Sequence, residues 1–349
     1  MKRLLAFCIA LIMLFVFSGC SKDTEGSIIT QITPTKRTTA STTEAKVLPV
    51  NIFTGENDIA EGDPTRPVGV VVGNNWKSRP QVGIEKADMY IEIETEGGIT
   101  RFLTVFANVN RLPDKIGPIR SARTPSVKMA DYLDLVYCHA GGSTTGKAKI
   151  KSVGLDDLDG CVDSTTFWRD SALRNSKGTE YSMMTGKEEV QKAFTSYGYS
   201  SESSVSSPFS FGEKAGDGLG NKVDVTFSYY QEDVFEYNAD TKLYTKFNYD
   251  EENGREHVTA SGDSLKITNV IVLFARKSME NSTTCDFDLS SGHGILASGG
   301  TSREISYSCS SDSGVKFFEK DGTTPLTVSV GKSYICVVNS AYESDMVLS

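Results

Sequence analysis

The sequence is poor in the side chains on which most catalytic and metal sites depend. Only three of its 349 residues are histidine, and no two cysteines are spaced as C-x-x-C. Metal centres need clustered histidine, cysteine or carboxylate ligands, so we predict neither a zinc site nor a redox pair, and no cofactor. The G-x-S-x-G pattern of many serine hydrolases is also missing, which disfavours that class of enzyme.

The chain also lacks an excess of positive charge. It has 36 Lys and Arg residues against 45 Asp and Glu residues, a formal net charge of −9. Nucleic-acid-binding proteins present a basic face to the phosphates, and docking on anionic lipid headgroups needs the same sign of charge. We therefore expect no nucleic-acid partner, and any membrane attachment must rest on something other than charge.

The apolar run at the N-terminus is shorter than the ~20 residues that a transmembrane helix needs. This 14-residue run, 4–17, follows Lys2 and Arg3 and precedes Ser18-Gly19-Cys20. The pattern resembles the lipobox of bacterial lipoproteins, in which Cys20 is lipidated after residues 1–19 are removed. It predicts an anchor on the outer face of the bacterial cytoplasmic membrane, and the loss of two basic residues takes the net charge from −9 to −11. The alternative is an ordinary secretory peptide with an incidental cysteine.

Seven cysteines occur, of which Cys8 would leave with the signal segment and Cys20 would carry the lipid. Export permits disulfides, but an odd number of remaining cysteines in a chain of this size is not typical of a disulfide framework. We therefore expect mostly reduced, buried thiols at the five other positions: Cys138, Cys161, Cys285, Cys309 and Cys336.

Composition divides the rest of the chain into a tether and two domains. Residues 20–47 are rich in Thr and Ser and should form a disordered tether with an r.m.s. reach of ~30 Å. A serine-rich and then glycine-rich stretch at 200–222 predicts a linker. We expect an α+β protein, with an α/β domain at 48–199 that contains a mixed sheet and a mainly β domain at 223–349.

Hydrophobic periodicity supports this division. In the first domain, strands are expected at 67–72, 88–95, 100–107 and 135–140, and a helix at 187–197. Ser121 could cap a further helix, in whose first turn Pro125 is tolerated. The second domain shows short segments separated by turns, which predicts strands at 223–230, 234–237, 242–249, 265–275, 302–307, 315–319 and 333–338.

The segment 141–147 has the spacing of a phosphate-binding loop between a predicted strand and a helical stretch. Such a loop needs a hydroxyl-bearing residue after its lysine to hold Mg²⁺, and this chain has Ala148 after Lys147. Nucleoside triphosphates are also absent from exported compartments, so hydrolysis of a nucleotide is not predicted. A glycine-rich turn at a helix N-terminus still favours some other anion.

The densest groups of charged residues lie in two segments, 92–101 and 116–123. Three glutamates at alternate positions in the first segment would share one face of an unbroken strand. Arginines in the second segment flank the expected start of a helix, where unpaired amides favour anions. These residues form either an anion-binding site or an internal salt-bridge network. The candidate ligand-binding residues are Glu96, Arg101, Arg120, Ser121, Arg123, Gly141, Gly142 and Ser143.

His139 follows an apolar strand and lies near Ser143 in the sequence. Nucleophilic catalysis would need the two within hydrogen-bond reach, whereas the alternative is a buried histidine bonded to a loop. An enzyme hypothesis takes His139 as the base and Glu92 or Glu96 as its acid or base partner. Glycoside chemistry needs carboxyls about 5 to 9.5 Å apart, which alternate residues of one strand satisfy.

The same segments resemble a family of bacterial envelope lipoproteins of unknown function, the YerB-like family, with paired N- and C-terminal domains. The family resemblance implies a two-domain fold and an envelope location, and no reaction. It runs from about Phe53 to the C-terminus and rests on Arg66-Pro67-Val68, Asn75, Arg79-Pro80-Gln81, Ala87-Asp88, Glu96-Gly97-Gly98-Ile99-Thr100-Arg101, Ile116-Gly117-Pro118-Ile119-Arg120-Ser121-Ala122-Arg123, His139-Ala140-Gly141-Gly142-Ser143 and, more loosely, Asn269-Val270-Ile271-Val272, Gly299-Gly300 and Gly331-Lys332-Ser333-Tyr334-Ile335.

One segment departs from the family pattern. After Phe167-Trp168-Arg169-Asp170 the family tends to have a Pro-His-Asn triplet, whereas this chain has Thr179-Glu180-Tyr181. The resemblance therefore implies that a reaction dependent on that histidine would be missing from this chain.

These observations favour a lipid-anchored envelope protein that binds an anionic ligand through arginine, glutamate and histidine side chains of the first domain. The expected partners are the membrane, through the lipid, and a cell-wall glycan, peptide or anionic polymer. A hydrolase or transferase that uses His139 is the first alternative. A scaffold that recruits envelope proteins is the second, and a large exposed apolar patch would be its sign.

Overall fold

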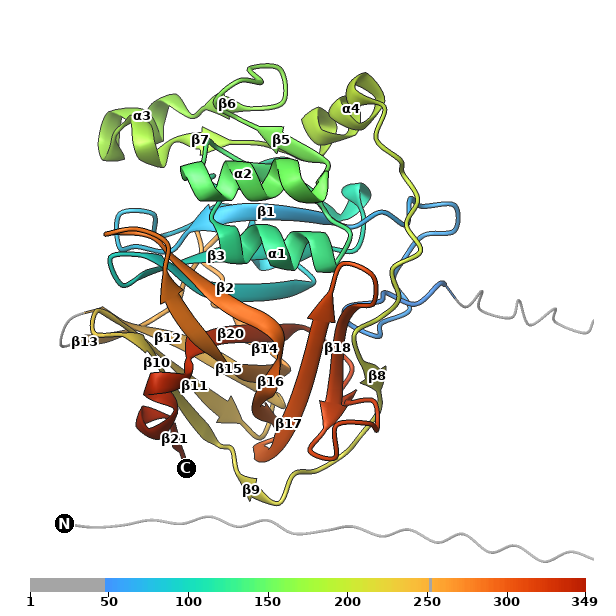
Figure 1. The fold of residues 1–349 in the computed structure, drawn as a ribbon, viewed down its shortest axis with the longest axis vertical. Coiled ribbons are helices and arrows are strands. Elements are labelled where there is room, and N and C mark those ends of the chain that lie inside the picture. The colour runs from blue at the N-terminus through green and yellow to red at the C-terminus, as the bar shows by residue number, and fades with distance from the viewer. Residues whose placement is uncertain (1–47, 251–252) are drawn as a thin grey trace, which may run out of the picture. The chain divides into compact units, whose positions relative to one another are not determined.

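The computed structural model describes residues 48–250 and 253–349 (Figure 1). The predicted signal segment, Cys20 and the predicted tether fall outside the described residues. The described residues belong to a single unit, Val47–Ser349. No helix in this part of the chain combines the length and the apolar character that a membrane span requires.

A mixed eleven-stranded sheet contains strands from both halves of the described chain, the N-terminal half before residue 200 and the C-terminal half from residue 200 onward. Its order is β18-β17-β16-β15-β20-β2-β3-β1-β4-β5, with β9 paired to β17. Strand β2 of the N-terminal half pairs in parallel with β20 of the C-terminal half. The strands are β1 (Val68–Gly73), β2 (Met89–Glu96), β3 (Ile99–Phe106), β4 (Val136–His139), β5 (Asp157–Asp159), β9 (Gly218–Leu219), β15 (Asn269–Met279), β16 (Cys285–Ser298), β17 (Thr301–Ser310), β18 (Gly314–Glu319) and β20 (Ser333–Asn339).

A six-stranded sheet from the C-terminal half lies at the lower left in Figure 1, below β1–β3 of the first sheet. Its order is β13-β12-β11-β10-β21, with β14 paired to β12. Two further pairs, β6 with β7 and β8 with β19, stand outside both sheets. These strands are β6 (Trp168–Arg169), β7 (Met183–Met184), β8 (Ser210–Phe211), β10 (Lys222–Ser228), β11 (Gln231–Asn238), β12 (Leu243–Asp250), β13 (Asn253–Glu256), β14 (Lys266–Ile267), β19 (Thr327–Val328) and β21 (Val347–Leu348).

In the described part of the chain the four α-helices all lie before residue 200, and two of them, α1 and α2, lie in front of β1–β3 in Figure 1. The α-helices of the described residues are α1 (Thr124–Tyr132), α2 (Thr144–Val153), α3 (Ser171–Lys177) and α4 (Lys187–Tyr197). Four short 3₁₀ helices complete the chain: η1 (Ile84–Lys86), η2 (Val109–Arg111), η3 (Thr179–Tyr181) and η4 (Ser340–Asp345). The protein is thus α+β, as predicted, with a mainly β C-terminal half.

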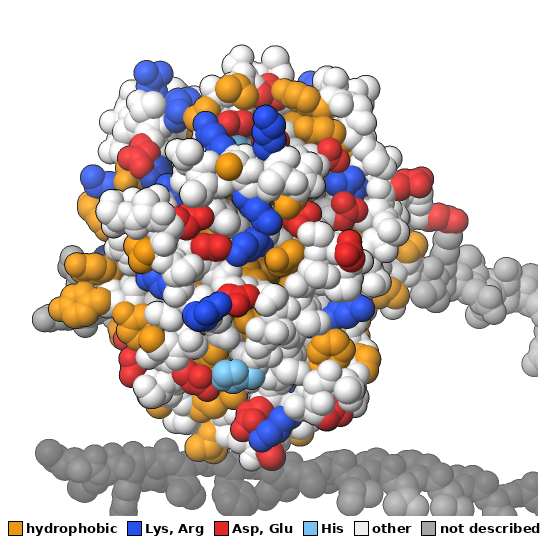
Figure 2. Space-filling view, in the orientation of Figure 1, with side chains coloured by type: hydrophobic (Ala, Val, Ile, Leu, Met, Phe, Trp, Pro, Cys, Tyr) orange, Lys and Arg blue, Asp and Glu red, His pale blue; other side chains and the backbone are white. Residues whose placement is uncertain are grey.

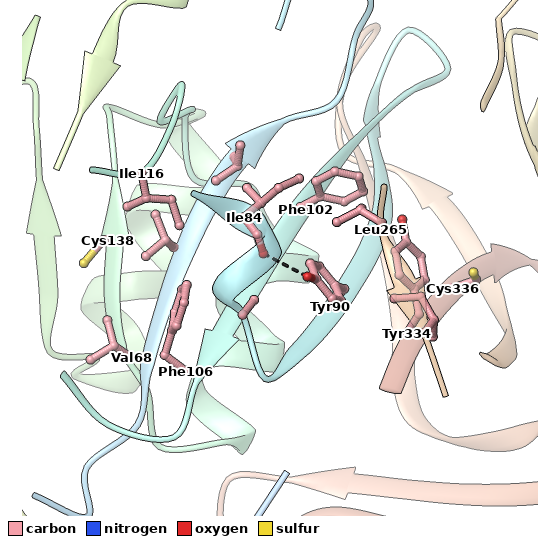
Figure 3. Close-up of a cluster of buried hydrophobic side chains, with 14 of the residues drawn as sticks. Val68, Ile84, Tyr90, Phe102, Phe106, Ile116, Cys138, Leu265, Tyr334 and Cys336 are labelled. Atoms are coloured by element: carbon pink, nitrogen blue, oxygen red, sulfur yellow. Dashed lines mark hydrogen bonds between the residues drawn. The ribbon is translucent and has the colours of Figure 1, made fainter. Parts of the chain in front are cut away.

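Both faces of the eleven-stranded sheet are buried, which explains why its strands are apolar at successive positions. Val70 and Val72 of β1 belong to the cluster that includes the six-stranded sheet and α4, whereas Val71 belongs to the cluster of α1 and α2. In the first cluster, the ring of Tyr334 stacks on Tyr90 at 5.5 Å (Figure 3). The same Tyr334 ring also contacts Phe235 of the six-stranded sheet, with centroids 5.0 Å apart. Burying a large apolar side chain contributes roughly 1.5–3 kcal/mol, so the apolar packing between the two sheets is a main source of stability.

Several predicted elements are confirmed and one boundary is wrong. The strands expected at 67–72, 88–95 and 100–107 are β1, β2 and β3, and the helix expected at 187–197 is α4. Ser121 does not cap α1, because Ala122 is still extended and bridges to Gly142. The helix begins at Thr124, with Arg123 in the N-cap position and Pro125 in the first turn as expected.

Strand β16 is the main element that the sequence does not predict. It spans 14 residues and includes Ser290-Ser291-Gly292, which have low strand propensity. The strand is hydrogen-bonded to β15 on one side and to β17 on the other. This pairing supplies the order that local sequence preference does not. The proposed linker and the domain boundaries remain predictions, since the central sheet runs through both halves of the chain.

The five cysteines of the described residues are free, and four of them, Cys138, Cys285, Cys309 and Cys336, are buried. The expectation of mostly buried thiols is therefore confirmed. Cys161 is the exception, because it lies exposed after β5. Burial raises the pKa of the Cys309 thiol to about 12, which keeps that thiol protonated and unreactive at neutral pH.

Candidate functional site

Glu96 lies at the centre of the predicted arginine cluster. Its carboxylate accepts hydrogen bonds from Arg123 Nε at 2.7 Å and Nη2 at 2.9 Å, and from Arg101 Nη2. The Arg101 side chain is only 4% exposed and also donates to the carbonyl oxygen of Ser121. Burial lowers the pKa of Arg101 and the nearby Glu96 carboxylate opposes this shift, so that the pKa is about 9. In this structure the three charged residues form an internal salt-bridge network.

A second internal carboxylate, that of Glu280, lies at the start of two helices. Glu280 belongs to the turn between β15 and β16, and its oxygens accept hydrogen bonds from the hydroxyl of Thr124 and, at 2.7 Å, from that of Thr145. Thr124 is in the first turn of α1 and Thr145 in the first turn of α2, where negative charge is stabilised by the helix dipoles. The protein's own carboxylate thus lies where the sequence suggests an external anion.

Arg120 is bound by a different segment. Its guanidinium donates to the carbonyl oxygen of Glu180 at 3.0 Å and to the Glu180 carboxylate, and lies 5.2 Å from the ring centroid of Tyr181. Both partners belong to η3, the segment in which the chain departs from the family pattern. In this chain the departing residues therefore pair with the arginine instead of supplying a histidine.

The glycine-rich loop before α2 uses its polar groups internally. The N–H of Gly141 donates to Asp159 Oδ1 at 2.6 Å. Ser143 is the N-cap of α2, and its hydroxyl oxygen accepts the N–H of Gly146 at 3.0 Å. Gly142 forms a bridge with Ala122. These two amides are therefore engaged by side chains of the protein, where a phosphate loop would direct its amides at an anion.

His139 is buried, and each of its ring nitrogens faces an acceptor. Nδ1 lies 2.8 Å from the carbonyl oxygen of Gly141, and Nε2 lies 2.9 Å from the carboxylate of Asp157. Both ring nitrogens are therefore engaged by groups of the protein itself. His139 thus matches the alternative of a buried, loop-bonded histidine.

Glu92 and Glu96 do not share a face, contrary to the sequence expectation. A β-bulge between Glu94 and Glu96 shifts the pairing of β2 with β3 and turns Glu96 towards Arg101. Glu92 bonds to Tyr334, on the face that meets the six-stranded sheet. The ring of His139 packs on Tyr137, whose cluster belongs to the opposite face.

Glu92 and His139 are also separated within the sheet. Their strands, β2 and β4, stand three positions apart in the order β2-β3-β1-β4, a separation of about 14 Å. The structure therefore does not bring Glu92 and His139 together as a catalytic pair.

Glu92 instead belongs to a buried polar network between the two sheets. One carboxyl oxygen accepts from Asn74 Nδ2 at 2.6 Å and from the hydroxyl of Thr100, and the other accepts from the hydroxyl of Tyr334. All of these residues are buried. A buried carboxyl group that is fully hydrogen-bonded avoids most of the free-energy cost of burial.

Lys246 of β12 faces Glu92 from the six-stranded sheet. Its Nζ lies 2.7 Å from the carboxylate of Asp233 and 3.8 Å from that of Glu92, and all three side chains are fully buried. The pKa of Glu92 is raised to about 8, first by burial and then by the nearby Asp233 carboxylate, while the Lys246 cation opposes the rise. This raised pKa favours the protonated form of Glu92 at neutral pH.

The network continues through His257 to the N-terminal half. His257 Nε2 lies 2.9 Å from Gln81 Oε1, and Nδ1 lies 3.2 Å from Asn248 Oδ1, which also accepts from Lys246 at 2.6 Å. Burial lowers the pKa of His257 well below its ordinary value, so the imidazole is neutral. The hydrogen bond between His257 and Gln81 therefore joins the C-terminal half of the chain to the N-terminal half.

An open groove with a volume of about 1030 Å³ lies next to this network. We call it the aromatic groove, since its lining includes Trp76, Tyr229, Tyr230, Tyr249 and Tyr342. Three of these rings are unusually accessible: Trp76 is 69% exposed, Tyr229 88% and Tyr230 65%. Figure 2 shows hydrophobic side chains gathered at the left edge of this view. Exposed aromatic rings beside a concave surface are typical of a binding site.

Local structure holds two of the exposed rings in place. The side-chain oxygen of Asn75 accepts from the N–H and the hydroxyl of Ser78 at 3.0 and 2.9 Å, and this turn presents Trp76 to solvent. The ring of Tyr230 lies against Gly98, whose φ is +81°. A Cβ at position 98 would lie 2.8 Å from Tyr230 Cδ2, so only glycine fits there.

Gln231 connects the aromatic groove to the buried network. Its Nε2 donates to Asp233 Oδ1 at 2.8 Å, which directs its Oε1 towards Arg79 Nη2 at 3.5 Å. Arg79 also donates to Asn74 Oδ1 at 3.3 Å, and Asn74 bonds to Glu92. The polar groups of the groove are thus positioned by a rigid, buried set of hydrogen bonds.

Sequence reasoning did not find the aromatic groove. Trp76 and the Tyr229-Tyr230 pair are far apart in the chain, and exposed aromatics on turns produce no periodic pattern. A partial signal exists, because Asn75, Arg79 and Gly98 are among the residues on which the family resemblance rests. Among the described residues, no group of histidine, cysteine and acidic side chains is arranged to hold a metal ion.

Comparison with known proteins shows the class of protein. Residues 53–200 match the N-terminal domain, and residues 223–335 the C-terminal domain, of a family described as a protein of unknown function, DUF3048. The two matches cover most of the chain, which belongs to this family, as the resemblance predicted.

Two similar proteins are YerB sequences of Bacillus subtilis. The protein named "Putative lipoprotein YerB" from strain 168 is 43% identical over 105 residues, which are 30% of this chain and 31% of that protein's length. The crystal structure of the YerB protein from Bacillus subtilis matches with a TM-score of 0.73 and 26% identity, over 86% of this chain and 99% of that chain. Neither name states a ligand or a reaction.

Proposed function

We propose that this protein is anchored by lipid on Cys20 at the outer face of the cytoplasmic membrane and binds a ligand derived from the cell wall in the aromatic groove. The lipobox pattern and the lipoprotein name of the relative support the anchor. The accessible rings of Trp76, Tyr229 and Tyr230 are the observation that supports binding. A pocket of this size with aromatic walls and a few fixed polar groups is typical of ligand sites.

This proposal moves the ligand from the arginine cluster to the aromatic groove. Glu96 already satisfies Arg101 and Arg123, and Glu180 satisfies Arg120. An external anion would have to displace these carboxylates, and the gain from its new ion pairs would be offset by the loss of the old ones. We assign the arginine cluster to holding the β2–β3 turn against α1.

Binding of a soluble cell-wall digest to the full-length protein in detergent, measured by calorimetry, tests the proposal. Trp76→Ala should weaken binding at least roughly tenfold, because a central aromatic residue commonly dominates an interface. Arg120→Ala should bind as the unmodified protein does. The reverse pattern would place the ligand at the arginine cluster, and an absence of binding to the digest would overturn the proposal.

The exposed rings also favour a second candidate, the recruitment of another envelope protein. Tyr229 and Tyr230 lie on the mainly β half, where the scaffold alternative predicts an apolar patch. A Trp76-dependent complex with an envelope protein, together with no affinity for the digest, would favour this function over ligand binding.

A further inference from the structure

We infer that the ligand class of the aromatic groove is a saccharide chain. The inference rests on the proposed function and deepens it, because it selects the glycan of the wall over its peptides and its anionic polymers. Three features of the groove carry it: the orientation of exposed rings, the fixed polar groups beside them and the balance of charge.

The accessible rings offer flat surfaces for stacking, and the ammonium group of Lys77 lies over one face of Trp76, 5.2 Å from the ring centroid. The rings of Tyr229 and Tyr230 stand perpendicular, at 89° and with centroids 5.1 Å apart, so the pair presents one face and one edge. Trp76 lines the same groove from a separate turn. A sugar ring has an apolar face of C–H groups that stacks on such a surface, and its hydroxyls remain free for the phenol groups at the ring ends.

The polar groups of the groove match the hydroxyls and amides of a sugar. Gln231 is nearly buried, and its orientation is set by the hydrogen bond to Asp233, so its carbonyl oxygen is held in place, 3.5 Å from Arg79 Nη2. Asn75 and Thr226 add further hydrogen-bonding side chains to the lining. Polar groups fixed by a buried network lose little entropy when they bind a ligand, and this favours an uncharged ligand that needs directional bonds.

The charge of the groove disfavours an anionic polymer. Two cations, Arg79 in the lining and Lys77 over the Trp76 ring, are balanced by two acids of the lining, Glu232 and Asp345, in a chain with a formal net charge of −9. A polyanion is usually held by clusters of lysine and arginine. The volume of about 1030 Å³ lies at the upper limit for drug-sized ligands, which suits several linked sugar rings better than one.

Titration of the full-length protein in detergent with three pure probes tests the inference. The probes are β-1,4-linked N-acetylglucosamine oligomers of two to six units, a synthetic wall stem peptide and polyglycerol phosphate. We expect the oligomers to bind, with an affinity that rises with length until the groove is filled. Trp76→Ala and Tyr230→Ala should each weaken this binding roughly tenfold or more.

Tyr197→Ala is the matched control, because Tyr197 is 51% exposed on α4 and does not line the groove. It should bind the oligomers as the unmodified protein does, and thermal unfolding should show that all three variants fold. Binding of the peptide or of polyglycerol phosphate in a Trp76-dependent manner, without the oligomers, would overturn the saccharide inference and leave the proposed function standing. If neither the probes nor the wall digest binds through Trp76, both fail.

Discussion

Glu92 is the residue whose chemistry depends most on its surroundings. It lies on a strand in which polar and apolar residues alternate in the sequence. Its carboxyl group is nevertheless fully buried, and its pKa is raised to about 8, chiefly by burial. Because this value lies above the ordinary one of 4.5, the folded state holds the proton more tightly than the unfolded chain does. The contribution of the bound proton to the free energy of unfolding is complete below pH 4.5 and is lost as the pH rises to 8.

Replacing Glu92 by glutamine should remove this dependence on pH. The amide keeps the neutral state and can reproduce the bonds from Asn74 and Thr100. Between pH 5 and pH 8 the free energy of unfolding of the unmodified protein should fall relative to that of Glu92→Gln, by an amount on the order of 3 kcal/mol. Urea denaturation at several pH values measures the difference. A constant difference across this range would show that Glu92 is ionised in the folded protein.

Glu96 neutralises a buried guanidinium, and its loss should be costly. Glu96→Ala leaves Arg101 buried without its carboxylate, so we expect a loss of roughly 2–4 kcal/mol in the free energy of unfolding. Glu180→Ala is the matched control, because Glu180 is 62% exposed and its pair with Arg120 should contribute no more than about 1 kcal/mol. Equal effects of the two substitutions in urea denaturation would contradict the structural role of the Glu96 cluster.

At the scale of elements, the turn between β2 and β3 connects the arginine cluster to the aromatic groove. The bulge in β2 sends Glu96 to one side, and the following glycines let the turn approach the six-stranded sheet. The hydroxyl of Ser228 donates to the carbonyl oxygen of Gly98 at 2.6 Å, which ties the turn to the end of β10. This turn therefore sets the position of Tyr230.

Gly98→Ala should disturb the turn through a contact, and the neighbouring glycine separates this effect from backbone strain. Both glycines have a positive φ, +60° at Gly97 and +81° at Gly98, but a Cβ at 97 meets nothing within 4 Å. Both substitutions should cost about 1 kcal/mol or more through strain. Only Gly98→Ala should also move Tyr230 and weaken binding in the groove. Similar losses of binding affinity in both variants would count against the contact.

For the whole molecule, the sharing of one sheet by both halves has a consequence for folding. Strand β2 is hydrogen-bonded to β20, and the buried network joins Glu92 to Lys246 across the sheets. A fragment of residues 48–199 would expose the edge of β2 and the apolar face that meets the six-stranded sheet. Such an exposed edge and face favour aggregation.

We therefore expect the 48–199 fragment to lack a cooperative unfolding transition, and the full chain to unfold in a single one. Circular dichroism during thermal unfolding measures both. A fragment that unfolds cooperatively with an amplitude proportionate to its length would show that the N-terminal half is an independent domain, as the composition of the linker suggests.

Much of the fold can be predicted because it depends on local pattern. Alternation and apolar runs place β1, β2, β3 and α4, and the acidic composition disfavours nucleic acid as a partner. The candidate site is harder to predict. Glu92 and Glu96 point to opposite faces of the sheet because of a β-bulge, which residue propensities do not indicate. Strand β16 was missed for a similar reason, because its order comes from its two neighbouring strands.

By itself the sequence determined strands such as β1, β2 and β3 and the helix α4, the excess of acidic residues, the family and the pattern of an exported lipoprotein. These properties follow from residues near one another in the chain. Only the tertiary structure decided that Glu96 neutralises arginines, that Glu92 meets Lys246 and that Trp76 and Tyr230 line one groove. These contacts join distant segments, and they depend on how two sheets pack, a geometry that short-range patterns do not contain.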